Sequence, residues 1–170
     1  MPKLALSIAG FDPSGGAGVL ADAKTFSHFK VQNHCVISMN TIQDENSFMS
    51  TSSMENYCLD QLSFLLESHT YEVAKIGLVP SMEFLQQALL KFPVSTKIIW
   101  DPILKSSTHF SFHKSIDYSL LEKIDLITPN LIEFATLCPE IDPKNWNSEN
   151  CALLLKGGHG QNEFSTDTLY

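Results

Sequence analysis

A dense glycine turn near the N-terminus is the first feature of this sequence whose residue types could do chemistry. The stretch SIAGFDPSGGAGVLADAKTF covers residues 7–26 and places Gly10, Gly15, Gly16 and Gly18 between an apolar run and a helix-like pattern. Glycines in this density cost chain entropy, so we infer that the backbone must approach something closely or adopt a left-handed conformation here. Such a turn can hold a phosphate, a dinucleotide or another small molecule.

Two phosphate-binding motifs come close to this turn. The Walker A motif requires GxxxxGK[ST], and although Gly10 and Gly15 match its glycines, Gly16 stands where the lysine belongs, which excludes the motif. The dinucleotide fingerprint GxGxx[GA] matches residues 16–21, but DPSG separates it from the strand that should directly precede it. The acidic residue expected at the end of the next strand is also missing, because residues 37–42 are uncharged. The dinucleotide match is therefore weak.

Further candidates follow the ends of the predicted strands. Ligands in open α/β sheets bind beyond the carboxyl ends of the strands, so these positions form an independent set of site candidates. They are Gly10 to Asp12, Gln43 and Asp44, Gly77 and Leu78, Asp101 and Pro102, Pro129 and Asn130, and Lys156 to His159. We expect a cleft at this edge of the sheet.

The elements that must position these residues alternate between strand-like and helix-like segments. The predicted strands are residues 4–9, 34–42, 72–78, 97–100, 124–128 and 152–155, and the predicted helices are residues 18–29, 55–67 and 81–92. Ser81 is the expected N-cap of the third helix, and Pro93 its stop. The alternation predicts an α/β fold with a mainly parallel central sheet and helices on both faces. Two polar stretches, residues 44–56 and 105–115, are expected to be surface loops or mobile flaps.

Composition excludes several classes of protein. The chain has 170 residues, which favours one domain, and its net charge is −8 with all eleven basic residues being lysine. No basic footprint for nucleic acid is visible, and no apolar run approaches the roughly 18 residues of a membrane span. The four cysteines form no CxxC pair, which favours reduced thiols in the cytoplasm. His109 and His113 lie four residues apart without a third ligand, and we interpret them as surface histidines.

Several segments resemble one known family. IAGFDPSGGAGVLADAKTF is similar to the N-terminal signature of the hydroxymethylpyrimidine/phosphomethylpyrimidine kinases, thiamine-pathway enzymes of the ribokinase-like superfamily. The segments VISMNTIQDEN, AKIGLVPS, IIWDPILKSS, LITPNLIEF and LLLKGGHG follow in the family's order and extend the resemblance over essentially the whole chain. It implies ATP-dependent phosphorylation of 4-amino-5-hydroxymethyl-2-methylpyrimidine and then of its monophosphate. It also implies Mg²⁺ and, commonly, a homodimer.

The resemblance also implies the residues of the site. The substrate residues would be Gly10, Ala17, Asp22, Gln43, Leu78 and Ile103. ATP or its phosphates would be bound by Asp101, Lys156, Gly157 and Gly158, and magnesium by Asn130 and Glu133, directly or through water.

The chemistry of these side chains agrees with such roles but leaves alternatives open. The amide of Gln43 offers an acceptor and a donor, which match the amino group and ring nitrogen of an aminopyrimidine. Asp22 can accept from the same amino group, although an exposed aspartate in the first turn of a helix is also favoured by the helix dipole. Asn130 and Glu133 have the spacing of a helix capping box as well as that of a magnesium motif.

Two points of the function stay open at this stage. No GTG-type turn, which carries the family's catalytic base and anion hole, is recognisable, so we expect residues 1–170 to be a single ribokinase-like domain lacking its C-terminal part. The catalytic residues would then lie beyond Tyr170. The alternatives are a pyridoxal kinase, because TPN-x-x-E and KGGH are shared with those enzymes, and a truncated vitamin-precursor-binding module without turnover.

Overall fold

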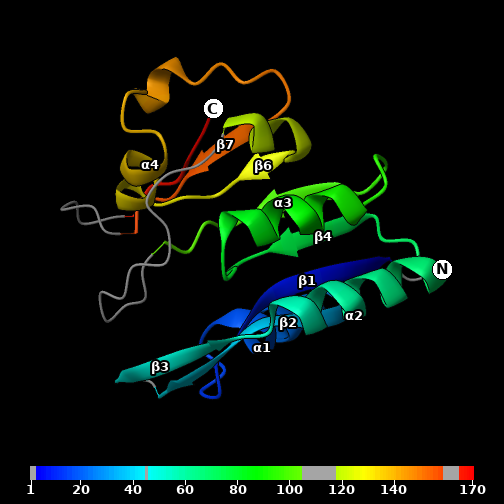
Figure 1. Cartoon of the computed structure of the whole chain (residues 1–170). Helices are drawn as coiled ribbons and strands as arrows, with labels where there is room; N and C mark the ends of the chain where they lie inside the picture. Colours follow the sequence, from blue (N-terminus) through cyan, green and yellow to red (C-terminus); the bar gives the residue numbers. More distant parts are fainter. Residues whose placement is uncertain (1–2, 45, 105–117, 159–164) are drawn as a thin grey trace.

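The computed structural model describes residues 3–44, 46–104, 118–158 and 165–170, and shows an α/β arrangement (Figure 1). Its strands are β1 (Leu4–Phe11), β2 (Gln32–Gln43), β3 (Phe48–Ser53), β4 (Val73–Ile76), β5 (Lys97–Trp100), β6 (Leu126–Ile127), β7 (Ala152–Leu155) and β8 (Thr168–Leu169). Its helices are α1 (Gly18–His28), α2 (Glu55–Ser68), α3 (Met82–Lys91) and α4 (Leu131–Leu137), with short 3₁₀ helices η1 (Tyr118–Lys123) and η2 (Pro143–Asn145).

The strands form one sheet in the order β3-β2-β1-β4-β5-β6-β7-β8. The pairings from β2 to β7 are parallel, whereas β3 and β8 pair antiparallel at the two edges. The predicted mainly parallel sheet is thereby confirmed. The chain runs from β1 outward to β2 and β3 and then returns to β4 on the other side of β1. The strand order therefore reverses between β1 and β4, which is where open α/β sheets hold ligands.

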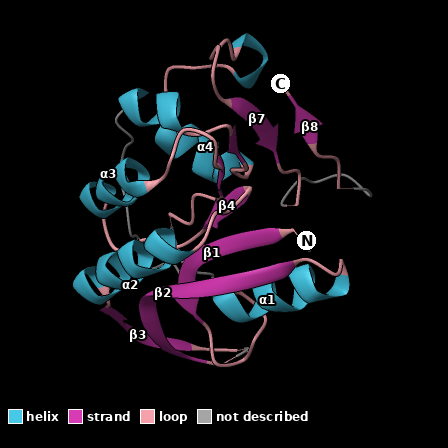
Figure 2. Ribbon diagram, turned by 90° about the vertical axis from the view of Figure 1, so that its right-hand side faces the viewer, coloured by secondary structure: helices cyan, strands magenta, loops and turns pink. Residues whose placement is uncertain are grey.

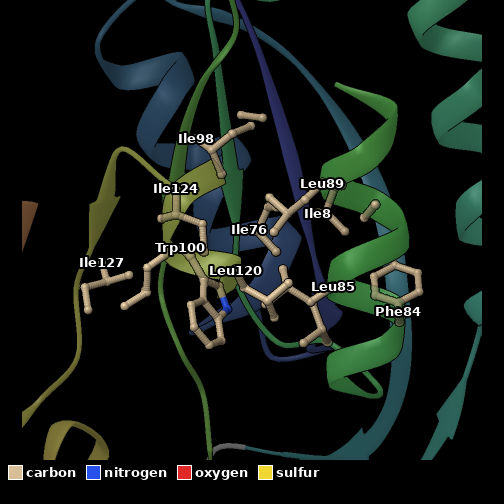
Figure 3. Close-up of a cluster of buried hydrophobic side chains, with 14 of the residues drawn as sticks. Ile8, Ile76, Phe84, Leu85, Leu89, Ile98, Trp100, Leu120, Ile124 and Ile127 are labelled. Atoms are coloured by element: carbon tan, nitrogen blue, oxygen red, sulfur yellow. The ribbon is translucent and has the colours of Figure 1, made fainter. Parts of the chain in front are cut away.

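One face of the sheet carries the main apolar core. The strand register places Ile8, Ile76, Trp100, Ile127 and Leu153 in one row across five parallel strands, and all five are buried. Helix α3 adds Phe84, Leu85 and Leu89 to the same cluster (Figure 3). Full burial of each such side chain contributes about 1.5–3 kcal/mol, so this face supplies much of the stability.

The opposite face of β1 and β2 is covered by α1, while α2 and α3 lie across the sheet from it (Figure 2). Side chains alternate between the two faces along a strand, so Ala74 and Ile76 face the core and Lys75 faces the other way. The register pairs Lys75 with Ser7 of β1, and Ser7 with Cys35 of β2. A row of smaller and polar side chains therefore lies under α1.

The predicted helices and strands are all present, with some ends shifted. Strands β5 and β7 have the predicted bounds, and Ser81 caps α3 by accepting a hydrogen bond from the Phe84 backbone N–H at 3.0 Å. The four cysteines are free, and Cys58, Cys138 and Cys151 are buried. No helix in the described part of the chain is long and apolar enough to cross a lipid bilayer.

The prediction of a loop or flap at residues 44–56 is wrong for its central part. Residues Phe48–Ser53 form β3, which pairs antiparallel with the end of β2. The sequence FMSTSS shows no apolar alternation because neither face of this edge strand is fully buried, and backbone pairing alone defines it. The other predicted flap, residues 105–115 with His109 and His113, lies outside the described residues.

Candidate functional site

The glycine turn between β1 and α1 is organised by the carboxylate of Asp12, which is only 5% exposed. Its Oδ1 accepts a hydrogen bond from the Ser14 backbone N–H at 2.9 Å. Its Oδ2 accepts from the Ser14 hydroxyl and from the Ala17 backbone N–H, each at 2.9 Å. Asp12 therefore stabilises the turn by hydrogen bonds within it and holds the backbone just before α1.

Gly18, the first residue of α1, explains the glycine requirement most directly. Its φ is +60°, a left-handed backbone that side chains disfavour. A Cβ at this position would lie only 2.0 Å from the carbonyl oxygen of Gly10. The turn is thus tight because the start of α1 packs directly onto the end of β1.

A cavity of about 480 Å³ opens beside this turn, at the carboxyl ends of β1, β2, β4 and β5. This volume falls in the range of small-molecule sites. The lining residues are Ala9, Gly10, Asp12, Gly16, Ala17, Gly18, Ala21, Asp22, Thr41, Gln43, Phe48, Lys75, Gly77, Leu78, Asp101 and Ile103. It lies where the strand order reverses, as the strand-end argument led us to expect.

The structure brings all six residues of the predicted substrate set into this one cavity. They come from β1, the glycine turn, α1, the end of β2, and the segments after β4 and β5. Gly10 allows close packing there, because a Cβ on it would lie 3.0 Å from Cδ2 of Leu78. Ser38 donates a hydrogen bond from its hydroxyl to the Leu78 carbonyl at 2.5 Å, which holds the cavity wall after β4.

Gln43 lies at the end of β2, and its side chain hydrogen-bonds the carboxylate of Asp12. Burial alone would raise the pKa of Asp12, but hydrogen bonds from Gln43, Ser14 and Ala17 outweigh it and lower the pKa. Because a carboxylate only accepts, the amide N–H₂ of Gln43 is the group that donates to it. Among the described residues, the amide oxygen and the second N–H of Gln43 have no other partner, so a ligand can use them.

Asp22 lies on α1, and its carboxylate is held by two residues of the sheet. Lys75 Nζ lies 3.0 Å from Oδ1 and 3.1 Å from Oδ2, and the Ser7 hydroxyl donates to Oδ2 at 2.5 Å. The side chain of Asp22 is 15% exposed, so its interpretation as an exposed helix-dipole residue is wrong. The carboxylate is instead an ordered group in the cavity wall.

Asp101, after β5, both lines the cavity and pairs with Lys156, after β7. Lys156 Nζ lies 2.6 Å from Asp101 Oδ1, and the Thr128 hydroxyl donates to the same oxygen at 3.2 Å. Two residues of the predicted nucleotide set therefore adjoin the predicted substrate set. The other two follow Lys156, and Gly157 donates its N–H to Asp167 at 3.0 Å.

Asn130 and Glu133 form the capping box at the start of α4 that their spacing allowed. Asn130 Oδ1 accepts from the Glu133 backbone N–H at 2.9 Å, and Glu133 Oε2 accepts from the Asn130 backbone N–H at 2.8 Å. Within the described part of the chain, no cluster of three or more His, Cys, Asp or Glu is placed to hold a metal. The magnesium role of these two residues stays a prediction, which the capping box neither requires nor excludes.

Sequence reasoning named Asp12 only as a candidate that follows a strand end, because its role depends on the folded turn. It did not include Ser7 and Lys75 in the site. Lys75 also had a signal, since it is a charged residue inside the otherwise apolar strand VAKI. Ser7 gave none, because its importance depends on the register that sets it beside Lys75.

Comparison with known proteins agrees with this geometry. The family model for phosphomethylpyrimidine kinase matches residues 12–170. The hydroxymethylpyrimidine/phosphomethylpyrimidine kinase of Aquifex aeolicus (strain VF5) is 31% identical over 185 residues, which cover 98% of this chain and 72% of that protein.

Solved structures share the fold. A phosphomethylpyrimidine kinase from Clostridium difficile 630 superimposes with a TM-score of 0.77 at 24% identity, covering 99% of this chain and 80% of that one. The pyridoxal kinase from Staphylococcus aureus in complex with ADP gives a TM-score of 0.78 at 20% identity, covering 100% and 69%. By fold and by sequence, the chain belongs to the phosphomethylpyrimidine kinase family of ribokinase-like proteins.

Proposed function

We propose that this chain performs the ATP-dependent phosphorylation of 4-amino-5-hydroxymethyl-2-methylpyrimidine and of its monophosphate in thiamine biosynthesis. The observation that supports the proposal most is the cavity itself. It gathers Gly10, Ala17, Asp22, Gln43, Leu78 and Ile103 around a volume suited to a single small ring. Family membership supports the same reaction.

Recognition of the pyrimidine rests on the side-chain amide of Gln43. With one N–H donated to Asp12, the remaining N–H faces a ring nitrogen while the amide oxygen accepts from the exocyclic amine. Asp22 accepts a second hydrogen bond from that amine. Leu78 and Ile103 contact the ring as apolar walls.

ATP would lie beside the cavity, near Asp101 and Lys156. Phosphoryl transfer depends on positioning and on neutralising charge around the phosphates, and magnesium supplies part of that neutralisation when bound. Lys156 brings a cation to this place, and Gly158 leaves the backbone open to the nucleotide, because no described atom lies within 4 Å of its would-be Cβ. Gly157 packs closely against the Thr166 backbone. Asn130 and Glu133 would contact the ion directly or through water, while one oxygen of each side chain also accepts the hydrogen bond of the helix cap. The catalytic base is left unassigned among the described residues.

Pyridoxal phosphorylation is the second candidate, and the fold similarity to the Staphylococcus aureus pyridoxal kinase favours it. Pyridoxal lacks an amino group beside a ring nitrogen, so it would leave Gln43 with an unpaired donor or acceptor. A site built to hydrogen-bond a group discriminates strongly against analogues without it. The side-chain amide of Gln43 therefore favours the pyrimidine over pyridoxal as the substrate.

Isothermal titration calorimetry with the pyrimidine and with pyridoxal tests the substrate, and ADP release tests turnover. We expect the pyrimidine to bind more tightly than pyridoxal and to stimulate ADP release in the presence of Mg-ATP. Equal or tighter binding of pyridoxal would overturn the substrate assignment. Pyrimidine binding with no ADP release would instead identify a binding module without turnover.

Three further properties are proposed. Chain length and the resemblance favour a single ribokinase-like domain spanning residues 1–170, the resemblance favours a homodimer, and the unpaired cysteines favour a cytoplasmic location. Light scattering after size exclusion measures the assembly directly, and a mass of twice 19.0 kDa for this chain is the expected result.

A further inference from the structure

The ion pair between Lys75 and Asp22 is a built feature of the cavity wall, contributed by three separate elements. Asp22 comes from α1, Lys75 from β4 and Ser7 from β1, and the strand register sets Ser7 directly beside Lys75. The side chains of Lys75 and Asp22 are 23% and 15% exposed, and Ser7 is fully buried. Both charged residues line the cavity.

The three hydrogen bonds to Asp22 leave it limited capacity for a ligand. An ionised carboxylate accepts at about four lone-pair positions. Lys75 takes one position on each oxygen and Ser7 takes the second on Oδ2, so one position, on Oδ1, is left by the described donors. Because the carboxylate has no proton to give, a ligand can fill that position only with a donor such as an amino group.

Gly77 leaves room for the ammonium group of Lys75. A Cβ at Gly77 would lie 3.0 Å from Lys75 Nζ and 3.2 Å from the Cβ of Ala9. Both contacts are tighter than ordinary van der Waals distances, so a methyl group at position 77 would require Lys75 Nζ and the Ala9 Cβ to give way by a few tenths of an ångström. The glycine at position 77 thus helps to accommodate the ion pair between Lys75 and Asp22.

We propose that Lys75 is a positioning residue that makes the cavity selective for ligands bearing an amino group, by holding Asp22 as a charged acceptor with one oxygen position open. The inference rests on the proposed function, because it takes the aminopyrimidine as the ligand. It adds a residue that sets the preference without contacting the amine itself.

A purely structural role for the ion pair makes a different prediction. If Lys75 only tied α1 to β4, its loss would weaken the binding of every ligand of the cavity by the same factor. If it positions Asp22, the loss depends on whether the ligand carries the amine. The ratio of two affinities therefore separates these roles, whereas stability alone does not.

The test uses Lys75→Met and two ligands, 4-amino-5-hydroxymethyl-2-methylpyrimidine and the same ring without its amino group. Titration calorimetry should show the amino compound losing about tenfold to hundredfold in affinity, the usual effect of a lost hydrogen bond to a charged group. The compound without the amine should change by less than about threefold, which is under 0.7 kcal/mol by the same conversion. Equal losses for both ligands, or no loss for either, would overturn the inference.

Lys97→Met is the matched control. Lys97 is another strand lysine in an ion pair, 2.6 Å from Asp125, but it lies outside the cavity lining. Both affinities should stay at the wild-type values. A change in the ligand ratio for this variant would show that the effect of Lys75→Met is not local, and the inference would fall.

Gly77→Ala provides a second route if Lys75→Met does not fold. The added methyl group displaces Nζ while keeping its charge, so the preference for the amino compound should shrink relative to wild type. An unchanged ratio in the folded variant would overturn the inference. Failure of the proposed function would be seen in a different measurement, because the wild-type protein would then not bind the aminopyrimidine at all.

Discussion

Lys156 Nζ lies 2.6 Å from Asp101 Oδ1, and this ion pair bridges the ends of β7 and β5 across β6. The two side chains are 34% and 23% exposed, so the pair borders the cavity rather than sitting in the core. Both residues are predicted to bind the nucleotide, and Asp101 lines the substrate cavity as well. The pair therefore marks the boundary between the two proposed half-sites.

Replacing Lys156 by methionine should weaken ATP binding and leave pyrimidine binding nearly intact. Loss of one charged hydrogen bond to a phosphate costs about 1.5–3 kcal/mol. Calorimetric titrations with Mg-ATP and with the pyrimidine measure the affinity of each proposed half-site. If pyrimidine binding were lost while ATP affinity held, the half-sites would have been assigned in the wrong order.

Gln43→Leu keeps the size of the side chain but removes its amide. Leaving the polar groups of the pyrimidine without partners should cost about 1–3 kcal/mol of binding free energy. The affinity for ATP should hardly change, and it serves as the internal control in the same calorimeter. Wild-type pyrimidine affinity in this variant would remove Gln43 from the site.

Gly18→Ala should destabilise the protein. The left-handed backbone alone costs about 1–2 kcal/mol with a side chain, and the new Cβ would clash with the Gly10 carbonyl oxygen. Urea unfolding measures the loss. Gly158→Ala is the comparison, because no described atom lies within 4 Å of its would-be Cβ, and its change should stay within about 0.5 kcal/mol. Equal losses in the two variants would contradict the steric argument.

Asp12 should make stability depend on acid pH. Its pKa in the folded protein is lowered from 3.8, so its contribution is fully present above that value and is lost as the pH falls through the lower folded value. Asp12→Asn cannot titrate there. The difference in unfolding free energy between wild type and variant should therefore be largest near neutral pH and shrink below about pH 4. A constant difference down to pH 3 would argue against this role.

Asn130→Ala should destabilise the chain by about 0.5–2 kcal/mol, because α4 loses its N-cap. Asn130→Asp keeps a capping oxygen and should retain most of the stability. Chemical denaturation without nucleotide or metal isolates this effect from any role in magnesium binding. Unchanged stability of the alanine variant would mean that the capping box contributes nothing.

Much of the fold follows from patterns that are local in the sequence. Continuous apolar runs predict the buried strands, and Ser81 and Pro93 predict the limits of α3, because each signal depends on a few adjacent residues. The cavity position follows from the carboxyl ends of parallel strands. The identity of the individual lining residues depended on the resemblance as well. Asp22, for example, would otherwise be interpreted as an ordinary helical aspartate.

The parts that were missed depend on pairing between distant residues. Strand β3 shows no apolar alternation, so only its hydrogen bonds to β2 reveal it. Lys75 resembles a surface lysine until the register sets it beside Ser7 and below Asp22. Likewise, the link between Asp12 and Gln43 joins the ends of two strands that no short motif connects.

The alternation along β4 has a consequence for how such a protein can diversify. Ala74 and Ile76 support the core, while Lys75 lies on the other face and lines the cavity, so substitutions at neighbouring positions affect different parts of the molecule. If Lys75 positions Asp22 as proposed, a substitution at Lys75 changes ligand preference without opening a void among the packed side chains. One short strand could thereby vary its ligand-facing residue while the core stays constant.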